Sequence, residues 1–141
     1  MTAEQWREDL RTLARELPKK HANAFHSITK ARFDSAVAAL DARLAEGNVN
    51  TDAAVAGLAS IAASIGDGHT RVLLPPSWGR IPLTLEWFGC AQGSAGPCEL
   101  RVTSAAPGHE RALGARVVAI DSMPVADVHR ALASSMAQGE T

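Results

Sequence analysis

The residues best suited to chemistry stand together in one short segment, Gly66-Asp67-Gly68-His69-Thr70-Arg71. Two glycines around an acid and an imidazole predict a turn with positive φ, which glycine adopts without steric cost. Imidazole groups titrate near neutral pH, so His69 is a candidate general base, with Asp67 and Thr70 as candidate orienting residues. The alternative is structural: Asp67 closes an Asx turn and His69 packs against its neighbours.

Two other histidines, His21 and His26, lie five positions apart in a polar segment. Their spacing is not that of an HExxH metal motif, so we expect them to contact backbone or water and predict no metal site. His109 and His129 are isolated and carry no signal. The chain has no GxSxG elbow, no phosphate loop and no GxGxxG. It therefore shows no nucleophile, and we expect no cofactor.

Cys90 and Cys98 bracket a glycine-rich, turn-like segment. They could pair across a hairpin in an oxidising compartment, or remain two thiols. The N-terminus has no apolar signal-peptide core, which favours two thiols and a cytoplasmic over an exported location.

The chain has 141 residues, of which 46% are hydrophobic and 21% charged, so it is expected to fold as one ordinary domain or two small ones. Its formal net charge of −1 argues against nucleic acid as the main partner. No apolar run approaches the roughly 20 residues that span a bilayer. The oligomeric state is left open.

Three amphipathic helices are predicted before Gly66. Thr2 and Gln5 form a capping-box pattern for the first, and Pro18 is expected to end it. Thr29 is the expected N-cap of the second helix, which ends near Gly47. The third runs from about residue 51 to residue 65. Their expected inward positions are Trp6, Leu10, Leu13 and Leu17; Phe33, Val37, Leu40 and Leu44; and Val55, Leu58, Ile61 and Ile65.

The chain after Gly66 has the pattern of a β-module. Residues 83–88 alternate like a strand, and residues 99–104 are its expected partner. Residues 114–121 read as a short buried strand, and Pro124 suits the first turn of a closing helix with Val125, Val128, Leu132 and Met136 on one face. The predicted fold class is α+β: a three-helix bundle over residues 1–66, then a small, mostly antiparallel β-module over residues 67–141.

Several segments, taken in order, resemble the N-terminal half of the tail-specific (C-terminal-processing) and tricorn-type serine peptidases. They are LPKKHANAFHSITKARFDSAVAALDARL, IAASIGDGHTRVLLP, IPLTLEWFG and LGARVVAIDSMPVADVHRAL. The resemblance covers nearly the whole chain, and GDGHT and LGARVVAID are its most specific parts. It implies a helical bundle and a PDZ-like or degenerate β-module, followed in the family by an α/β catalytic core that bears the serine and its oxyanion hole.

Tricorn-type members use a histidine in the turn that matches GDGHT, so the resemblance implies that His69 is a general base. Asp67 or Thr70 would fix its tautomer. Those members have a serine where this chain has Gly68. Processing-protease members use a serine–lysine pair instead, and there the matching histidine is not the base. The implied substrate is a peptide or unfolded protein, and the chain alone is expected to be inactive.

Two other functions remain open. The chain could be a non-catalytic peptide-binding module whose β-segment accepts a peptide as an added strand. It could also be a structural or oligomerisation domain that makes a protein contact through Trp78, Trp87 and Phe88.

Overall fold

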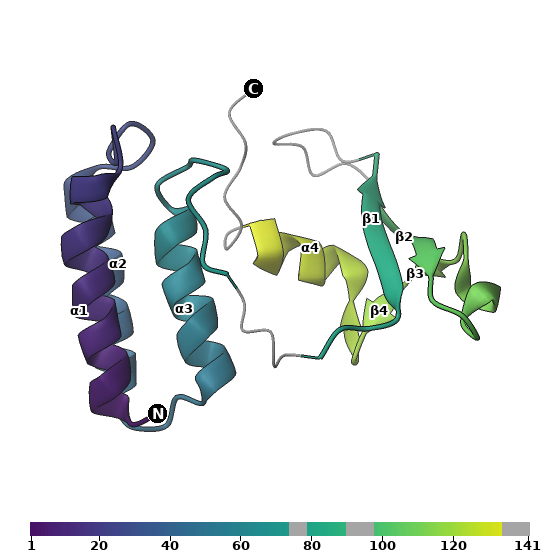
Figure 1. Cartoon of the computed structure of the whole chain (residues 1–141), viewed down its shortest axis with the longest axis horizontal. Helices are drawn as coiled ribbons and strands as arrows, with labels where there is room; N and C mark the ends of the chain where they lie inside the picture. Colours follow the sequence, from purple (N-terminus) through teal and green to yellow (C-terminus); the bar gives the residue numbers. More distant parts are fainter. Residues whose placement is uncertain (74–78, 90–97, 134–141) are drawn as a thin grey trace. The chain divides into compact units, whose positions relative to one another are not determined.

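The computed structural model describes residues 1–73, 79–89 and 98–133. They form an α+β fold in which three helices precede a small antiparallel sheet and a closing helix, so the predicted fold class is confirmed (Figure 1). The chain divides into a helical unit and a β-containing unit. Residues 67–73 belong to the helical unit, whereas the division expected from the sequence places them with the β-module.

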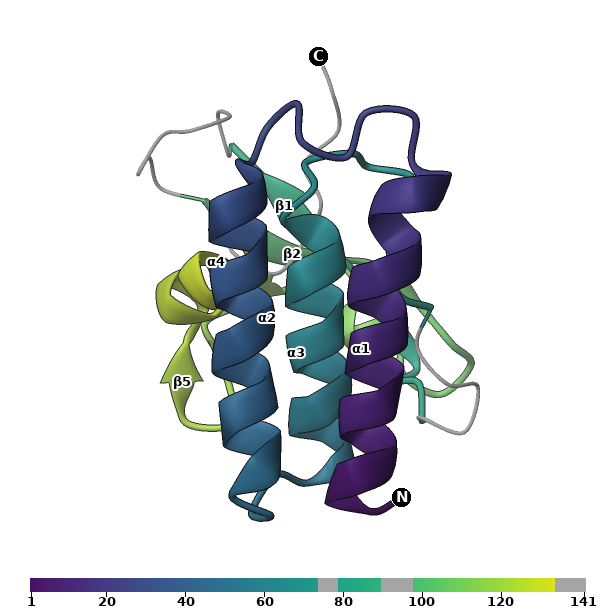
Figure 2. The ribbon, with the colours of Figure 1, turned by 90° about the vertical axis from the view of Figure 1, so that its left-hand side faces the viewer.

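The helical unit consists of α1 (Ala3–Lys20), α2 (Lys30–Ala45) and α3 (Thr51–Ala63), which pack on one another. Successive helices run in opposite directions, so α1 and α3 point the same way and their C-terminal ends lie at one end of the bundle (Figure 2). The segment after α1 and the turn after α3 therefore meet at that end. This placement builds the candidate site.

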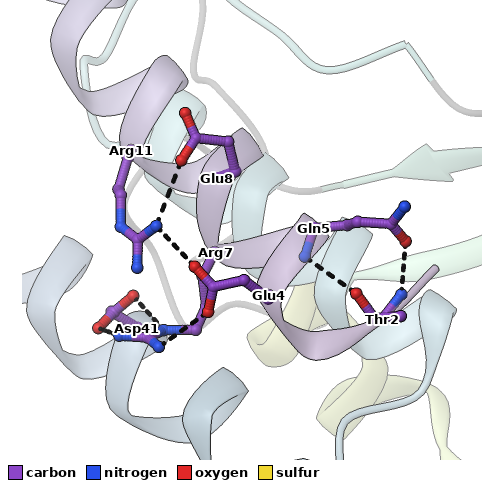
Figure 3. Close-up of polar contacts among 7 residues, drawn as sticks. All are labelled: Thr2, Glu4, Gln5, Arg7, Glu8, Arg11 and Asp41. Atoms are coloured by element: carbon purple, nitrogen blue, oxygen red, sulfur yellow. Dashed lines mark hydrogen bonds and ion pairs between the residues drawn. The ribbon is translucent and has the colours of Figure 1, made fainter.

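The helix starts follow local capping rules. The Thr2 hydroxyl accepts the Gln5 amide at 3.2 Å and the Thr2 amide donates to the Gln5 side chain at 2.7 Å, which confirms the capping box (Figure 3). Thr29 accepts the backbone N–H of Arg32 at 3.3 Å, as predicted. Asn50 caps α3 through its side-chain oxygen.

The predicted end of the first helix at Pro18 is wrong, because α1 continues to Lys20. A proline in the last turn removes a single main-chain donor. The following turn is still closed, since the His21 amide donates to the Leu17 carbonyl at 3.1 Å.

The core of the helical unit contains most of the predicted apolar stripes, but Leu13, Leu17, Val37 and Leu58 are only half-buried, and the small side chains of Ala24, Ala54 and Ala62 are buried instead. Leu10, Phe33, Leu44 and Ile65 are fully buried. Burial of each such side chain is worth about 1.5–3 kcal/mol relative to exposure. Gly57 allows α2 and α3 to approach closely, since a Cβ there would lie 2.6 Å from a methyl carbon of Leu40.

Charged side chains join α1 to α2 outside this core. The Arg7 guanidinium binds both carboxylate oxygens of Asp41, at 2.8 and 2.9 Å, and also contacts Glu4 at 3.2 Å (Figure 3). Arg11 bridges Glu4 and Glu8 on the same helix. The hydrogen bond from Arg7 holds the pKa of Asp41 below its ordinary value. This two-pronged contact fixes the register of α1 on α2.

The β-containing unit has a three-stranded antiparallel sheet with the order β1-β2-β3. β1 (Leu83–Phe88) pairs with β2 (Glu99–Ala105) from Leu83 opposite Ala105 to Phe88 opposite Glu99. β3 (Arg116–Val117) pairs with the other edge of β2. Half-buried and exposed residues alternate along β1, which confirms the predicted strand.

The predicted single buried strand over residues 114–121 is wrong. The chain forms β3, breaks at Val118, and then forms β4 (Ala119–Ile120), which pairs with β5 (Met123–Pro124). Asp121, at φ 45°, turns the chain between these short strands, and most of the segment is exposed. The apolar residues of this segment are therefore not a sign of a buried strand.

The closing helix α4 spans Val125–Ala133, and the Val125 amide donates to the Val118 carbonyl at 3.0 Å. A short 3₁₀ turn covers Glu110–Ala112. Met136, expected on the inner face of the last helix, lies outside the described residues. Across the described part of the chain, no helix is long and apolar enough to cross a membrane.

Candidate functional site

The turn after α3 is shaped by Gly66. Its φ of +80° turns the chain immediately after the buried Ile65, and the Thr70 amide donates to the Asp67 carbonyl at 3.0 Å. A Cβ on Gly66 would lie 2.7 Å from both the Cβ and the hydroxyl of Ser27. The segment after α1 therefore packs directly against this turn, and glycine is required for two separate reasons.

Asp67 is the centre of the polar contacts at this end of the bundle. Its Oδ1 accepts the backbone N–H of His69 at 2.9 Å, which confirms the Asx turn. Its Oδ2 contacts the Thr70 hydroxyl at 2.9 Å and Nε2 of His21 at 3.1 Å. The His69 amide, followed by the Thr70 hydroxyl and then His21, holds the pKa of Asp67 far below its usual range. Asp67 is thus an ionised carboxylate whose orientation is held by these three contacts.

His69 stands beside this carboxylate with its ring in solvent. Nδ1 of His69 lies 3.4 Å from Oδ1 of Asp67, and the side chain is fully exposed. The alternative that His69 packs against its neighbours is therefore wrong for the described residues. A carboxylate at one imidazole nitrogen orients the ring and stabilises its protonated form, so that the other nitrogen can accept a proton. The structure places all three predicted site residues, Asp67, His69 and Thr70, in one cluster.

His21 also belongs to this cluster, although the sequence predicts only backbone or water contacts for it. Its side chain is 15% exposed and reaches Asp67 across a separation of 46 residues. Its other nitrogen, Nδ1, accepts the Asn23 amide at 3.1 Å. The ring stacks on His26 with centroids 6.1 Å apart and planes 4° from parallel, and Nδ1 of His26 contacts the Asn23 carbonyl at 2.8 Å. The predicted backbone contacts are present, but the contact with Asp67 is additional.

A surface depression of about 510 Å³ adjoins these residues. It is lined by Lys20, His21, Ala22, Asn23, His26 and Asp67. Within residues 1–73, 79–89 and 98–133, no three histidine, cysteine or acidic side chains are grouped so as to hold a metal ion. The chemistry that this site offers is proton transfer and hydrogen bonding.

A second polar cluster lies in the β-containing unit. The ring of His129 on α4 packs edge-on against Trp87 of β1 at 4.7 Å between centroids, and its Nε2 lies 3.7 Å from Sγ of Cys98. His129, which carries no sequence signal, thus links α4 to the sheet. Cys98 is disulfide-bonded, so the expectation of two thiols is wrong. Cys98 directly precedes Glu99, the first residue of β2, which pairs with Phe88 at the end of β1. Cys90 and Trp78 lie outside the described residues.

Comparisons with protein-family models, curated proteins and solved structures find no match for this chain. The functional argument therefore rests on the geometry around Asp67 and on the sequence motifs.

Proposed function

We propose that this chain is the N-terminal part of a serine-type peptidase in which His69 is the general base. The observation that supports this most directly is the pairing of the exposed His69 ring with the fixed carboxylate of Asp67. The order of the GDGHT and LGARVVAID segments supports the same reading. The substrate class is a peptide or unfolded protein, and the nucleophile comes from a catalytic region beyond this chain.

The chemistry follows from what an exposed, oriented imidazole can do. A serine hydroxyl is a weak nucleophile and needs a base within hydrogen-bond reach. Nε2 of His69 takes the hydroxyl proton as the serine oxygen bonds to the carbonyl carbon, and Asp67 stabilises the resulting imidazolium. The same proton passes to the leaving amine when the peptide bond breaks. Water then releases the acyl group from the serine by the reverse proton route.

Peptidase activity of the complete gene product tests this proposal. His69→Ala should lower kcat on an unfolded protein substrate by about 10²- to 10⁴-fold, the contribution of a general base. His109→Ala is the matched control, since His109 is exposed and distant in sequence from the turn. Activity that survives His69→Ala would favour a serine–lysine pair and overturn the proposed role. A gene product with no serine-bearing α/β region would overturn the proposal as a whole.

A second candidate function, a peptide-binding module, is supported by the position of β1 at the edge of the three-stranded sheet that the described residues form. Among the described residues β1 pairs only with β2, so its other edge can accept an added strand. A depression of about 290 Å³ lies at its start, lined by Ile81, Pro82, Leu83, Thr84, Ser104, Ala105 and Ala106. Titration with peptides of varied C-terminus should shift the amide signals of residues 83–88. Unchanged signals would reject this function.

The third possibility, an oligomerisation contact through Trp78, Trp87 and Phe88, has less support. The Trp87 ring is already engaged by His129 within the same unit. We therefore propose no such contact.

A further inference from the structure

Asp67 makes more contacts than its turn requires. An Asx turn is closed by the single bond from the His69 amide to Oδ1. The contact of Oδ2 with His21 comes from the segment after α1 and adds nothing to the closure of the turn. A carboxylate held at both oxygens cannot rotate about its Cβ–Cγ bond without losing a contact. The additional bond therefore restricts the orientation of the whole carboxylate.

The contacts of His21 determine which nitrogen carries its proton. The Asn23 amide is a donor, so Nδ1 of His21 must be an acceptor and therefore unprotonated in this arrangement. The proton of the neutral ring then lies on Nε2 and is donated to Oδ2 of Asp67. His26 has the opposite requirement, because its Nδ1 faces the Asn23 carbonyl and must donate. Two stacked imidazoles in opposite tautomers are the consequence.

We propose that His21 is a positioning residue that holds Oδ2 of Asp67 so that Oδ1 remains directed at His69. The residue touches neither substrate nor nucleophile, and its catalytic consequence rests on the proposed function of His69. The Thr70 hydroxyl shares Oδ2, so the two donors hold the carboxylate together. The loop after α1 thereby helps to orient Asp67 in the turn after α3.

The tautomers can be measured directly on this chain. Long-range ¹⁵N–¹H spectra of the imidazoles should show His21 with its proton on Nε2 and His26 with its proton on Nδ1. A His21 ring with its proton on Nδ1 could not donate to Asp67 and would overturn the proposal. This measurement needs no substitution, so a variant that fails to fold cannot leave the proposal untested.

Two substitutions separate positioning from packing. His21→Leu removes the donor, and the Asp67 carboxyl, followed by its ¹³C signal, should titrate at higher pH, with a change in the ring signals of His69. His21→Gln retains an N–H donor and should restore much of the wild-type behaviour. His109→Leu should change neither signal. Asp67 and His69 signals that do not move in a folded His21→Leu variant would refute the positioning role.

Activity of the complete gene product keeps this inference distinguishable from the proposed function. His21→Leu should lower kcat by about 10- to 100-fold with little change in KM, the size expected for a misplaced catalytic group, and His21→Gln should recover part of the loss. If the spectra agree with the proposal but His69→Ala costs no activity, the role of His69 as base fails and the positioning of Asp67 stands. A rise in KM alone for His21→Leu would refute a role in orienting the base.

Discussion

Gly66→Ala tests whether the loop after α1 and the turn after α3 interlock as the structure shows. Gly66 combines a φ of +80° with a close approach, since an added Cβ would lie 2.7 Å from the Cβ of Ser27. Gly47 offers a matched control, because it has a similar φ of +74° and nothing within 4 Å of the added atom. Comparing the two substitutions therefore isolates the contact with Ser27.

The expected losses in the free energy of unfolding follow from the positive φ and from the close approach to Ser27. A side chain in the left-handed region costs about 1–2 kcal/mol, and replacing glycine by alanine returns about 0.4–1 kcal/mol through the unfolded chain. Gly47→Ala should thus lower the free energy of unfolding by about 1 kcal/mol. Overpacking against Ser27 adds about 1–3 kcal/mol for Gly66→Ala. The difference between the two variants is therefore expected to be about 1–3 kcal/mol.

Urea unfolding followed by the helical circular dichroism signal measures both costs. A third background makes the assignment specific: Ser27→Gly removes the two atoms that would lie 2.7 Å from the new Cβ and leaves only an ordinary contact with Nε2 of His26 at 3.9 Å. In that background the cost of Gly66→Ala should fall to that of Gly47→Ala, a coupling that a double-mutant cycle quantifies. Equal costs for the two alanine variants in the wild-type background would show that the loop does not pack on the turn. The reasoning that places His21 at Asp67 would then lose its structural basis.

Two further predictions concern the stability of the helical unit. The folded pKa of Asp67 lies below its unfolded value, so its contribution to stability is complete above the ordinary carboxyl range near pH 4 and is lost as the pH falls below it. Asp67→Asn should lower stability at neutral pH and flatten the acid limb of a pH series of urea unfolding; an unchanged limb would contradict the contacts of Asp67. Phe33 is 1% exposed and packs edge-on against Phe25, so Phe33→Ala should cost about 3–5 kcal/mol in thermal unfolding, whereas Ser35→Ala on the exposed face should stay within about 0.5 kcal/mol. A small loss of stability for Phe33→Ala would contradict the burial of Phe33 in the core.

The features that the sequence predicts correctly are those set by neighbouring residues. The Thr2 and Thr29 caps depend on contacts three residues apart, and the apolar stripes depend on the helical period. The alternation of β1 likewise reflects its own pleat. The Asx turn at Asp67, considered from the sequence as the structural alternative for that residue, closes over two residues. Such patterns need no knowledge of the tertiary fold.

The features that it misses depend on how distant segments meet. The bond between His21 and Asp67 spans 46 residues. It requires an up-down-up arrangement of helices that places the first and third connections at one end. In a three-helix bundle whose neighbouring helices alternate in direction, the first and third connections share one end, so the predicted bundle contained part of this signal. For residues 114–121, by contrast, the break at Val118 follows from pairing with Met123 and Pro124, which an apolar run does not encode.

The exposure of His69 constrains how the site could act. A carboxylate–imidazole pair in water is weak, because the high dielectric constant screens it and solvent competes for both groups. The same pair is far stronger when another surface covers it and excludes water. Asp67 is already fixed by Thr70 and His21, whereas the ring of His69 is uncovered within the described residues. The orientation of the Asp67 carboxylate is therefore set within this chain, while burial of the His69 ring has to come from another surface that covers the turn. The positioning of Asp67 should accordingly be measurable on the isolated chain, and the loss of turnover on His69→Ala only where the covering surface is present.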